Sequence, residues 1–242
     1  MLTRENMLNG TFVRVHEALL PANMLWDAEK IRASMNSTLE ERPTGAPVWI
    51  FAYGSLMWNP VLAIEEMQRA RLKGWQRSFC IRLISGRATP DVPGRMLSLD
   101  EGGITEGIAF RLPESTLINE LEIVWTREMI TGLYRPVWAD VSLGNGKEIQ
   151  ALAFVSDRLH PHYEQDNLTA TVALSIASAR GDIGTNADYV WKLQATLGAL
   201  GIRDDYVSEL ALALHEAPCV TNGAIVIHTQ RLKSDPGGNL LS

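Results

Sequence analysis

The sequence has little cysteine and no long apolar run, and each absence excludes a class of protein. Only two of the 242 residues are cysteines, Cys80 and Cys219, which argues against a secreted disulfide scaffold and fits a reducing compartment. No run of about 18 apolar residues occurs, so the sequence predicts no membrane span. The N-terminus starts with charged and polar residues and lacks the apolar stretch of a secretory signal. We therefore expect a cytoplasmic protein.

Excess positive charge is also missing. The formal net charge is −6, which provides no general attraction to a phosphate backbone, so nucleic-acid binding is disfavoured. The chain is 46% hydrophobic and 21% charged, values that are ordinary for a globular protein and allow a substantial core.

The composition changes along the chain and suggests three parts. Residues 1–46 contain a helical pattern at Asp27–Leu39 and end in the charged, helix-breaking stretch Glu40–Gly45. This part is too short to bury much surface alone, so we expect an N-terminal extension packed on the main domain. The main domain is expected at 47–216, and 217–242 is expected to be a C-terminal tail.

Strand signals come first in the main domain and helix signals last. The expected strands are Val48–Tyr53, Arg69–Leu83 with a break near Gly74, Arg95–Leu99, Gly107–Leu112, Tyr134–Leu143 and Glu148–Val155. Gly102-Gly103 is expected to be a turn, and Asn145-Gly146 is expected to close a hairpin. The expected helices are Glu114–Met129, Leu168–Ala179, Asn186–Leu200 and Asp204–Leu214. This order predicts an α+β fold with a mixed or mostly antiparallel sheet.

A carboxylate extends the apolar face of the helix expected at Glu114–Met129. The apolar residues of that face, at 3.6 residues per turn, are Leu117, Leu121, Val124 and Trp125. Glu128 continues the same face, whereas Glu120 and Glu122 are expected to point away from it. Burying a carboxylate costs several kcal/mol unless it is paired or neutralised. Glu128 is therefore either an ion-pair partner of an arginine such as Arg127, or a carboxyl with a raised pKa that exchanges protons near neutrality.

The stretch VWIFAYGSLMWNP, residues 48–60, starts as a strand and stops at Gly54-Ser55. A Gly-Ser turn at a strand end can present successive backbone N–H groups to a carboxylate or oxyanion. The alternative is a tight turn in which the glycine only permits an unusual backbone angle. Ser55 is not expected to be a nucleophile, because the second glycine of a G-x-S-x-G elbow is absent. His160 and His162 flank Pro161 without an obvious third ligand, so no metal site is predicted.

Five motifs in order resemble the ChaC-type γ-glutamylcyclotransferases, from about Val48 to about Leu214. They are FAYGSLMWNP, PGRMLSL, GIAFRLPE, WTREMITGLY and GTNADYVWKL. Ala52 stands where that family usually has glycine. The resemblance implies an α+β fold in which a mixed, mostly antiparallel sheet forms a closed or nearly closed barrel with flanking helices.

The resemblance also implies a lyase-type activity, the conversion of glutathione, a small-molecule substrate, to 5-oxoproline and Cys-Gly. Because the substrate's own α-amine would attack its γ-carbonyl, no metal or organic cofactor is expected. Glu128 would be the general acid and base. The residues expected to bind the substrate are Ala52, Tyr53, Gly54, Ser55, Leu56 and Met57, with Tyr189 in the GTNADYVWKL segment.

Arg87 and Arg95 are candidates to bind the substrate carboxylates, since a guanidinium can do so bidentately. The alternative is that both make surface or structural ion pairs. Two alternatives to the function also stay open: another γ-glutamyl amine or dipeptide as the substrate, or a non-catalytic binding or regulatory protein on the same scaffold.

Overall fold

Five strands of the computed structural model, which describes residues 2–217, 219–221 and 224–226, close into a barrel in the order β1-β3-β2-β4-β5. They are β1 (Trp49–Ala52), β2 (Glu66–Leu83), β3 (Gly94–Arg111), β4 (Tyr134–Leu143) and β5 (Glu148–Ser156). β1 and β5 pair in parallel, and the other neighbouring strands pair antiparallel. The predicted fold class, a mixed and mostly antiparallel closed barrel, is confirmed.

β3 runs through the residues that were expected to form a turn. The prediction of separate strands on either side of Gly102-Gly103 is wrong, because these glycines lie inside one strand of 18 residues. Their φ angles are 113° and 63°, and they lie where the pairing register with β2 shifts around Gly74, which has φ 83°. Three left-handed glycines therefore make a bulge in a continuous ladder, and a bulge adds bend and twist to the paired strands.

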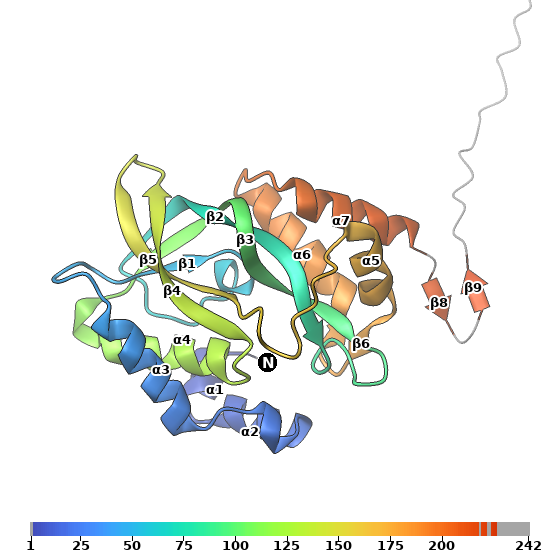
Figure 1. Ribbon diagram of the computed structural model, residues 1–242, viewed down its shortest axis with the longest axis horizontal. Coiled ribbons are helices and arrows are strands. Elements are labelled where there is room, and N and C mark those ends of the chain that lie inside the picture. Colours follow the sequence, from blue (N-terminus) through green and yellow to red (C-terminus); the bar gives the residue numbers. More distant parts are fainter. Residues whose placement is uncertain (1, 218, 222–223, 227–242) are drawn as a thin grey trace, which may run out of the picture.

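The helices form two groups on different sides of the barrel (Figure 1). The first group is α1 (Arg4–Leu8), α2 (Thr11–Leu19), α3 (Ala28–Glu40) and α4 (Leu117–Met129). The second group is α5 (Thr169–Ser178), α6 (Asn186–Ala199) and α7 (Asp205–Glu216). Short 3₁₀ turns lie at Ala22–Met24, Ser55–Met57 and Glu114–Thr116, and two small strand pairs are β6 (Arg180–Gly181) with β7 (Gly184–Thr185) and β8 (Cys219–Thr221) with β9 (Ala224–Val226). Among the residues described, no helix is long and apolar enough to cross a membrane.

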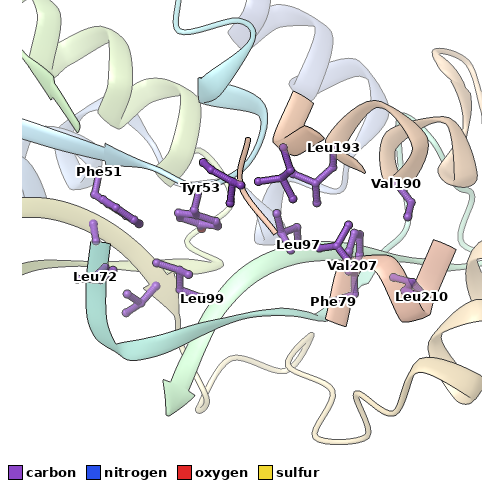
Figure 2. Close-up of a cluster of buried hydrophobic side chains, with 14 of the residues drawn as sticks. Phe51, Tyr53, Leu72, Phe79, Leu97, Leu99, Val190, Leu193, Val207 and Leu210 are labelled. Atoms are coloured by element: carbon purple, nitrogen blue, oxygen red, sulfur yellow. The ribbon is translucent and has the colours of Figure 1, made fainter. Parts of the chain in front are cut away.

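β1 is buried on both faces, which explains its unbroken apolar sequence. Successive side chains of a strand point to opposite faces, so Trp49 and Phe51 join the barrel core that continues to α6 and α7 (Figure 2). Ile50 and Ala52 join a second core between the barrel and the helices α3 and α4. The strand that leads into the Gly54-Ser55 turn is therefore held from both sides.

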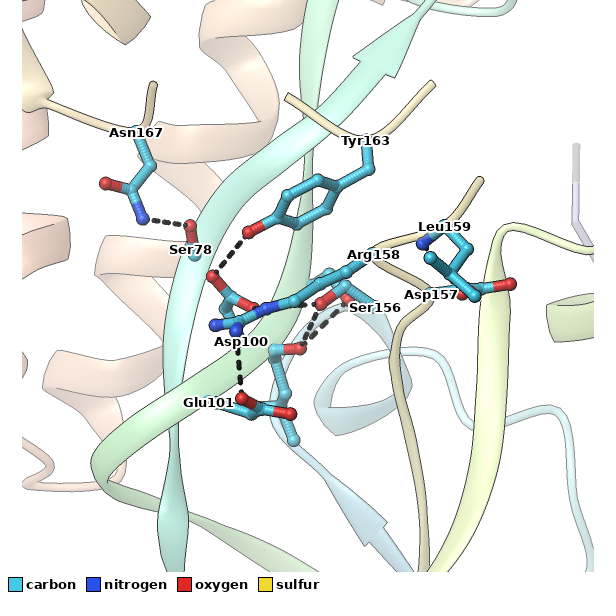
Figure 3. A network of polar contacts seen from close by, with 11 residues as sticks. Ser78, Asp100, Glu101, Ser156, Asp157, Arg158, Leu159, Tyr163 and Asn167 are labelled. Atoms are coloured by element: carbon cyan, nitrogen blue, oxygen red, sulfur yellow. Dashed lines mark hydrogen bonds and ion pairs between the residues drawn. The ribbon is translucent and has the colours of Figure 1, made fainter. Parts of the chain in front are cut away.

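A buried carboxylate, Asp100, ties β3 to the end of β5 and the loop that follows (Figure 3). It accepts hydrogen bonds from Arg158 Nε at 2.7 Å, Tyr163 Oη at 2.9 Å and Ser156 Oγ at 3.3 Å. Burial alone would raise the pKa of Asp100, but the bonds from Arg158 and Tyr163 hold that pKa below its ordinary value. These hydrogen bonds connect β3 to the end of β5 and to the following loop, and so they hold one end of the barrel together.

Glu120 is buried, although its spacing places it away from the apolar face of α4 that carries Glu128. The N-terminal segment covers that side of α4, and Arg4 donates to both carboxylate oxygens at 2.6 Å. The Ala63 N–H donates to the same carboxylate at 2.8 Å. The Glu120 side chain is 1% exposed, whereas that of Glu122 is 46% exposed. Helices α1 and α3 both contact α4. The boundary at residue 46 between the N-terminal extension and the main domain stays a prediction.

Replacing Arg4 with methionine should lower the free energy of unfolding by about 1–3 kcal/mol, because a buried carboxylate loses its cation. Arg4 is 39% exposed, which keeps the cost below that of a fully buried pair. The measurement is urea denaturation at neutral pH. Arg203→Met is the control, because Arg203 and Asp205 form an exposed pair and such pairs contribute about 0–1 kcal/mol. Equal losses in the two variants would contradict this account of Glu120.

Candidate active site

Two cavities meet at Glu128. The inner cavity, of about 30 Å³, lies at the end of β1 and is lined by the 53–56 turn together with Leu97 and Phe154. The outer cavity, of about 290 Å³, is lined in part by residues of the N-terminal helices. The residues that line both are Ser55, Glu128, Tyr134 and Tyr189. The carboxyl predicted from helical periodicity thus lies at the junction of the two spaces.

Glu128 is paired with Arg127 and also has a raised pKa. Arg127 Nε lies 2.9 Å from Glu128 Oε1, and the Glu128 side chain is 15% exposed. Burial nevertheless raises the pKa of Glu128 above its ordinary 4.5, against the lowering effect of the Arg127 charge and hydrogen bond. A carboxyl in this state can both accept and donate a proton closer to neutrality than a surface glutamate.

Arg127 connects Glu128 to the turn after β1. Its Nη2 donates to Ser55 Oγ at 2.8 Å, and its Nη1 donates to the carbonyl of Asn59. The guanidinium therefore holds the carboxyl and the turn in one arrangement. Its Nε, Nη1 and Nη2 each donate to one of these groups, so Arg127 fixes the carboxyl relative to the turn. Sequence reasoning identified Arg127 only as an ion-pair partner.

Gly54 is required by a close approach between the turn and α6. A Cβ at this position would lie 2.8 Å from Tyr189 Oη and 3.0 Å from a Leu97 methyl carbon. The glycine thus does more than permit an unusual backbone angle, because it lets the turn reach the Tyr189 hydroxyl.

Two predicted site residues do not line either cavity. Ala52 is fully buried in β1, and Met57 packs against both cores.

Tyrosine side chains surround Glu128. Tyr53 Oη donates to the Phe154 carbonyl at 2.7 Å, and Tyr134 Oη donates to the Leu97 carbonyl at 3.0 Å. Burial, and then the negative charge of Glu128, raise the pKa of Tyr189 to about 12. Tyr189 therefore stays a protonated hydroxyl near neutrality. Sequence reasoning missed Tyr134, whose only signal was its place at the end of the WTREMITGLY motif.

Arg87 and Arg95 both line the outer cavity. Arg95 is 7% exposed, its Nη2 lies 3.6 Å from Glu164, and its Nη1 has no hydrogen-bond partner. The Asn186 side chain accepts from the Arg95 N–H at 2.8 Å and donates to the Arg95 carbonyl at 3.0 Å, which fixes the backbone there. A buried donor without a partner is costly, which makes Arg95 Nη1 an unsatisfied cationic donor next to the outer cavity.

Arg87 is more fully engaged than Arg95. Its Nη1 donates to the Thr185 carbonyl at 2.9 Å and lies 3.7 Å from Asp188. Thr185 and Asp188 form the capping box of α6. Arg87 therefore makes the structural contacts that were the alternative to substrate binding. Nη1 of Arg95, by contrast, has no hydrogen-bond partner.

A family model described as "ChaC-like protein" matches residues 48–217. The chain belongs to the ChaC-like family. The Escherichia coli (strain K12) protein named glutathione-specific gamma-glutamylcyclotransferase is 46% identical over 214 residues, which cover 88% of this chain and 92% of that protein. The zebrafish (Danio rerio) protein named glutathione-specific gamma-glutamylcyclotransferase 1 is 30% identical over 150 residues, or 60% of this chain and 76% of that protein.

The fold of this ChaC-like chain also occurs in a solved structure. The crystal structure of a selenomethionine-labelled γ-glutamyl cyclotransferase specific to glutathione from yeast matches with a TM-score of 0.63. The match covers 70% of this chain and 96% of that one at 18% identity. This likeness concerns the fold and agrees with the closed barrel.

Glu128 and Glu120 lie on the same helix of the ChaC-like chain and should titrate with opposite effects on stability. The folded-state pKa of Glu128 is raised above 4.5, so the wild type loses stability as the pH rises through that pKa. Glu128→Gln does not titrate, so its stability relative to wild type should increase from about pH 4 to pH 8. Urea denaturation across this range measures the difference.

Glu120→Gln is the matched control on α4. The folded-state pKa of Glu120 is lowered, since the hydrogen bonds from Arg4 and Ala63 together overcome burial, which is the largest single effect and would raise it. Its stabilising contribution is present above pH 4.5 and is lost as the pH falls through the lowered pKa. Glu120→Gln should therefore lose stability relative to wild type as the pH rises. The same slope for both variants would show that the two environments do not differ as described.

Proposed function

We propose that the protein is a glutathione-specific γ-glutamylcyclotransferase, a lyase that releases 5-oxoproline and Cys-Gly. The observation that carries the proposal is the position of Glu128 between a small inner cavity and a larger outer cavity. The proposed place of the γ-glutamyl group is the junction of the two cavities, against the turn after β1, because the inner cavity of about 30 Å³ is too small to hold the whole group. Cys-Gly would lie in the outer cavity, with the scissile amide beside the carboxyl. The name of the Escherichia coli relative supports glutathione as the substrate.

The reaction requires no protein nucleophile, because the substrate attacks itself. The α-amine nitrogen of the γ-glutamyl unit forms a bond to its own γ-carbonyl carbon, and the bond from that carbon to the cysteinyl nitrogen breaks. Glu128 takes a proton from the attacking amine and returns one to the departing nitrogen. A raised pKa suits both steps, and holding the bent substrate in place supplies much of the acceleration.

The turn after β1 is the proposed site for the substrate oxygens. Backbone N–H groups at Gly54, Ser55 and Leu56 are suited to bind the α-carboxylate or the oxygen that becomes negative in the transition state. Tyr189 stays protonated and adds a hydroxyl donor to the same space. Tyr53 closes the inner end, while Ala52 and Met57 support the turn through packing and are not proposed to touch the substrate.

The outer cavity is the proposed site for the Cys-Gly half. Arg95 Nη1 lacks a partner, so it is the proposed donor to the terminal carboxylate, with Arg87 as a second cation. No metal or organic cofactor enters the proposal, because each step moves a proton between the substrate and Glu128. We also propose that the enzyme works in the cytoplasm, the compartment that glutathione keeps reduced.

Glu128→Gln should lower kcat for glutathione by about 10²–10⁴-fold, because the amide cannot carry the proton. Substrate affinity should change much less, since the amide oxygen still accepts from Arg127 and the binding turn is unaltered. Release of 5-oxoproline measures turnover, and calorimetry measures glutathione binding. Glu122→Gln, an exposed change on the same helix, is the control. A folded Glu128→Gln protein with near wild-type turnover would show that Glu128 is only structural.

Ser55→Ala should keep activity within about tenfold of wild type, because it removes one hydrogen bond to Arg127 and no nucleophile. Mass spectrometry of the wild type during turnover should find no acyl group on Ser55. Detection of an acyl-serine intermediate, or complete loss of activity in folded Ser55→Ala, would replace the internal attack with acyl transfer to the enzyme.

A further inference from the structure

The N-terminal segment forms one wall of the outer cavity. The residues it contributes are Leu2, Phe12, His16 and Leu20. Phe12, His16 and Leu20 stand four residues apart and so share one face of α2 and its end. The rings of Phe12 and His16 contact each other with centroids 4.2 Å apart. These residues precede the family match, which starts at residue 48.

Two sets of contacts hold the wall beside the candidate active site. Arg4 pairs with Glu120 and donates to the Val61 carbonyl at 2.9 Å, and Asn59 Nδ2 donates to the Leu2 carbonyl at 3.0 Å. Val61 has φ 53°, a conformation that β-branched residues rarely adopt, so its loop is held in place by its neighbours. The carbonyl of the same Asn59 accepts from Arg127, which links the wall directly to the group that positions Glu128.

The second attachment follows Glu128 along the chain. The Trp26 N–H donates to the Ile130 carbonyl at 2.8 Å. The Trp26 indole packs so closely on Gly132, which has φ 64°, that a Cβ there would lie 2.2 Å from the indole nitrogen. The N-terminal segment is therefore anchored on both sides of the outer cavity, before and after the catalytic helix.

The size and charge of the outer cavity indicate what kind of ligand this wall would contact. Ligand cavities are usually about 300–1,000 Å³, so at about 290 Å³ the outer cavity is small, and a ligand that fills it would contact the N-terminal wall. Arg87 and Arg95 supply positive charge, and the wall supplies Phe12, Leu20 and an imidazole. This combination fits a short peptide that ends in a carboxylate.

We infer that the N-terminal segment is part of the active site and selects the leaving group, enclosing the dipeptide half of the substrate through Phe12 and His16. The inference rests on the proposed function, since that function places the leaving half in the outer cavity. It adds that residues outside the family match decide between γ-glutamyl compounds of different length. Phe12 and His16 are specificity-determining residues that take no part in proton transfer.

The test compares glutathione with γ-glutamylcysteine, which lacks the terminal glycine. In the double variant Phe12→Ala and His16→Ala, kcat/KM for glutathione should fall about tenfold or more, because lost pocket contacts of this size discriminate at that level. The fall should appear mainly in KM. For γ-glutamylcysteine kcat/KM should change less than about threefold. The control is Val15→Ala with Leu19→Ala, two residues of α2 that are each 47% exposed, which should leave the ratio of the two substrates unchanged.

A second variant covers the case in which the double variant fails to fold, as judged by circular dichroism. His16→Glu keeps a helix-forming residue and introduces a carboxylate that competes with the substrate carboxylate for Arg95. It should raise KM for glutathione by about tenfold and affect the glycine carboxamide of glutathione less, because that analogue has lost the competing charge.

The outcomes separate this inference from the proposed function. Wild-type protein that releases no 5-oxoproline from glutathione would overturn both. If the wild type is active but each variant keeps the wild-type ratio of kcat/KM between the two substrates it is tested with, the proposed selection of the leaving group is wrong and the proposed activity is unaffected. A fall that is equal for both substrates would also overturn it, because that result indicates a general structural role.

Discussion

The buried ion pair between Arg127 and Glu128 is the interaction on which the site depends. A carboxyl at the end of an apolar helix face is unstable in the charged form unless a cation is near. Arg127 supplies that cation through its Nε, and its Nη2 and Nη1 donate to Ser55 Oγ and to the Asn59 carbonyl. One guanidinium therefore limits the rise in the pKa of the carboxyl that burial causes, and fixes its orientation and its position relative to the turn after β1. Any change in the loop at Asn59 reaches Glu128 through two hydrogen bonds.

The barrel provides the rigidity that this arrangement needs. β1 is packed on both faces and ends at the turn, so Gly54 arrives at a defined place beside Tyr189. A closed sheet has no free edge through which the strand end could shift. Reaction by internal attack demands placement more than it demands reactive side chains. The packed end of β1, the approach of Gly54 to Tyr189 and the single carboxyl of Glu128 are consistent with that demand.

Helix α4 shows that the environment of a glutamate, and not its residue type, decides its chemistry. Glu120 and Glu128 lie about two turns apart; the Glu120 side chain is fully buried, whereas that of Glu128 is 15% exposed. Arg4 and the Ala63 N–H satisfy Glu120 and lower its pKa, whereas burial outweighs Arg127 at Glu128 and raises its pKa. The first glutamate anchors the N-terminal segment, and the second faces the cavities. The segment that stabilises the first also encloses the space next to the second.

The sequence by itself determined most of the barrel strands, the helices α3 to α7 and the place of Glu128 on an apolar helix face, because hydrophobic periodicity and turn residues are local properties. It also identified the family, since five motifs in order carry that information. Only the tertiary structure decided that Gly102-Gly103 is a bulge, that Ala52 and Met57 do not face the cavities, and that Glu120 is buried. It alone brought Tyr134, Arg95 Nη1 and the Phe12–His16 face together. These features depend on partners far away in the chain, such as Arg4 for Glu120, and no local pattern records which distant residue will cover a given face.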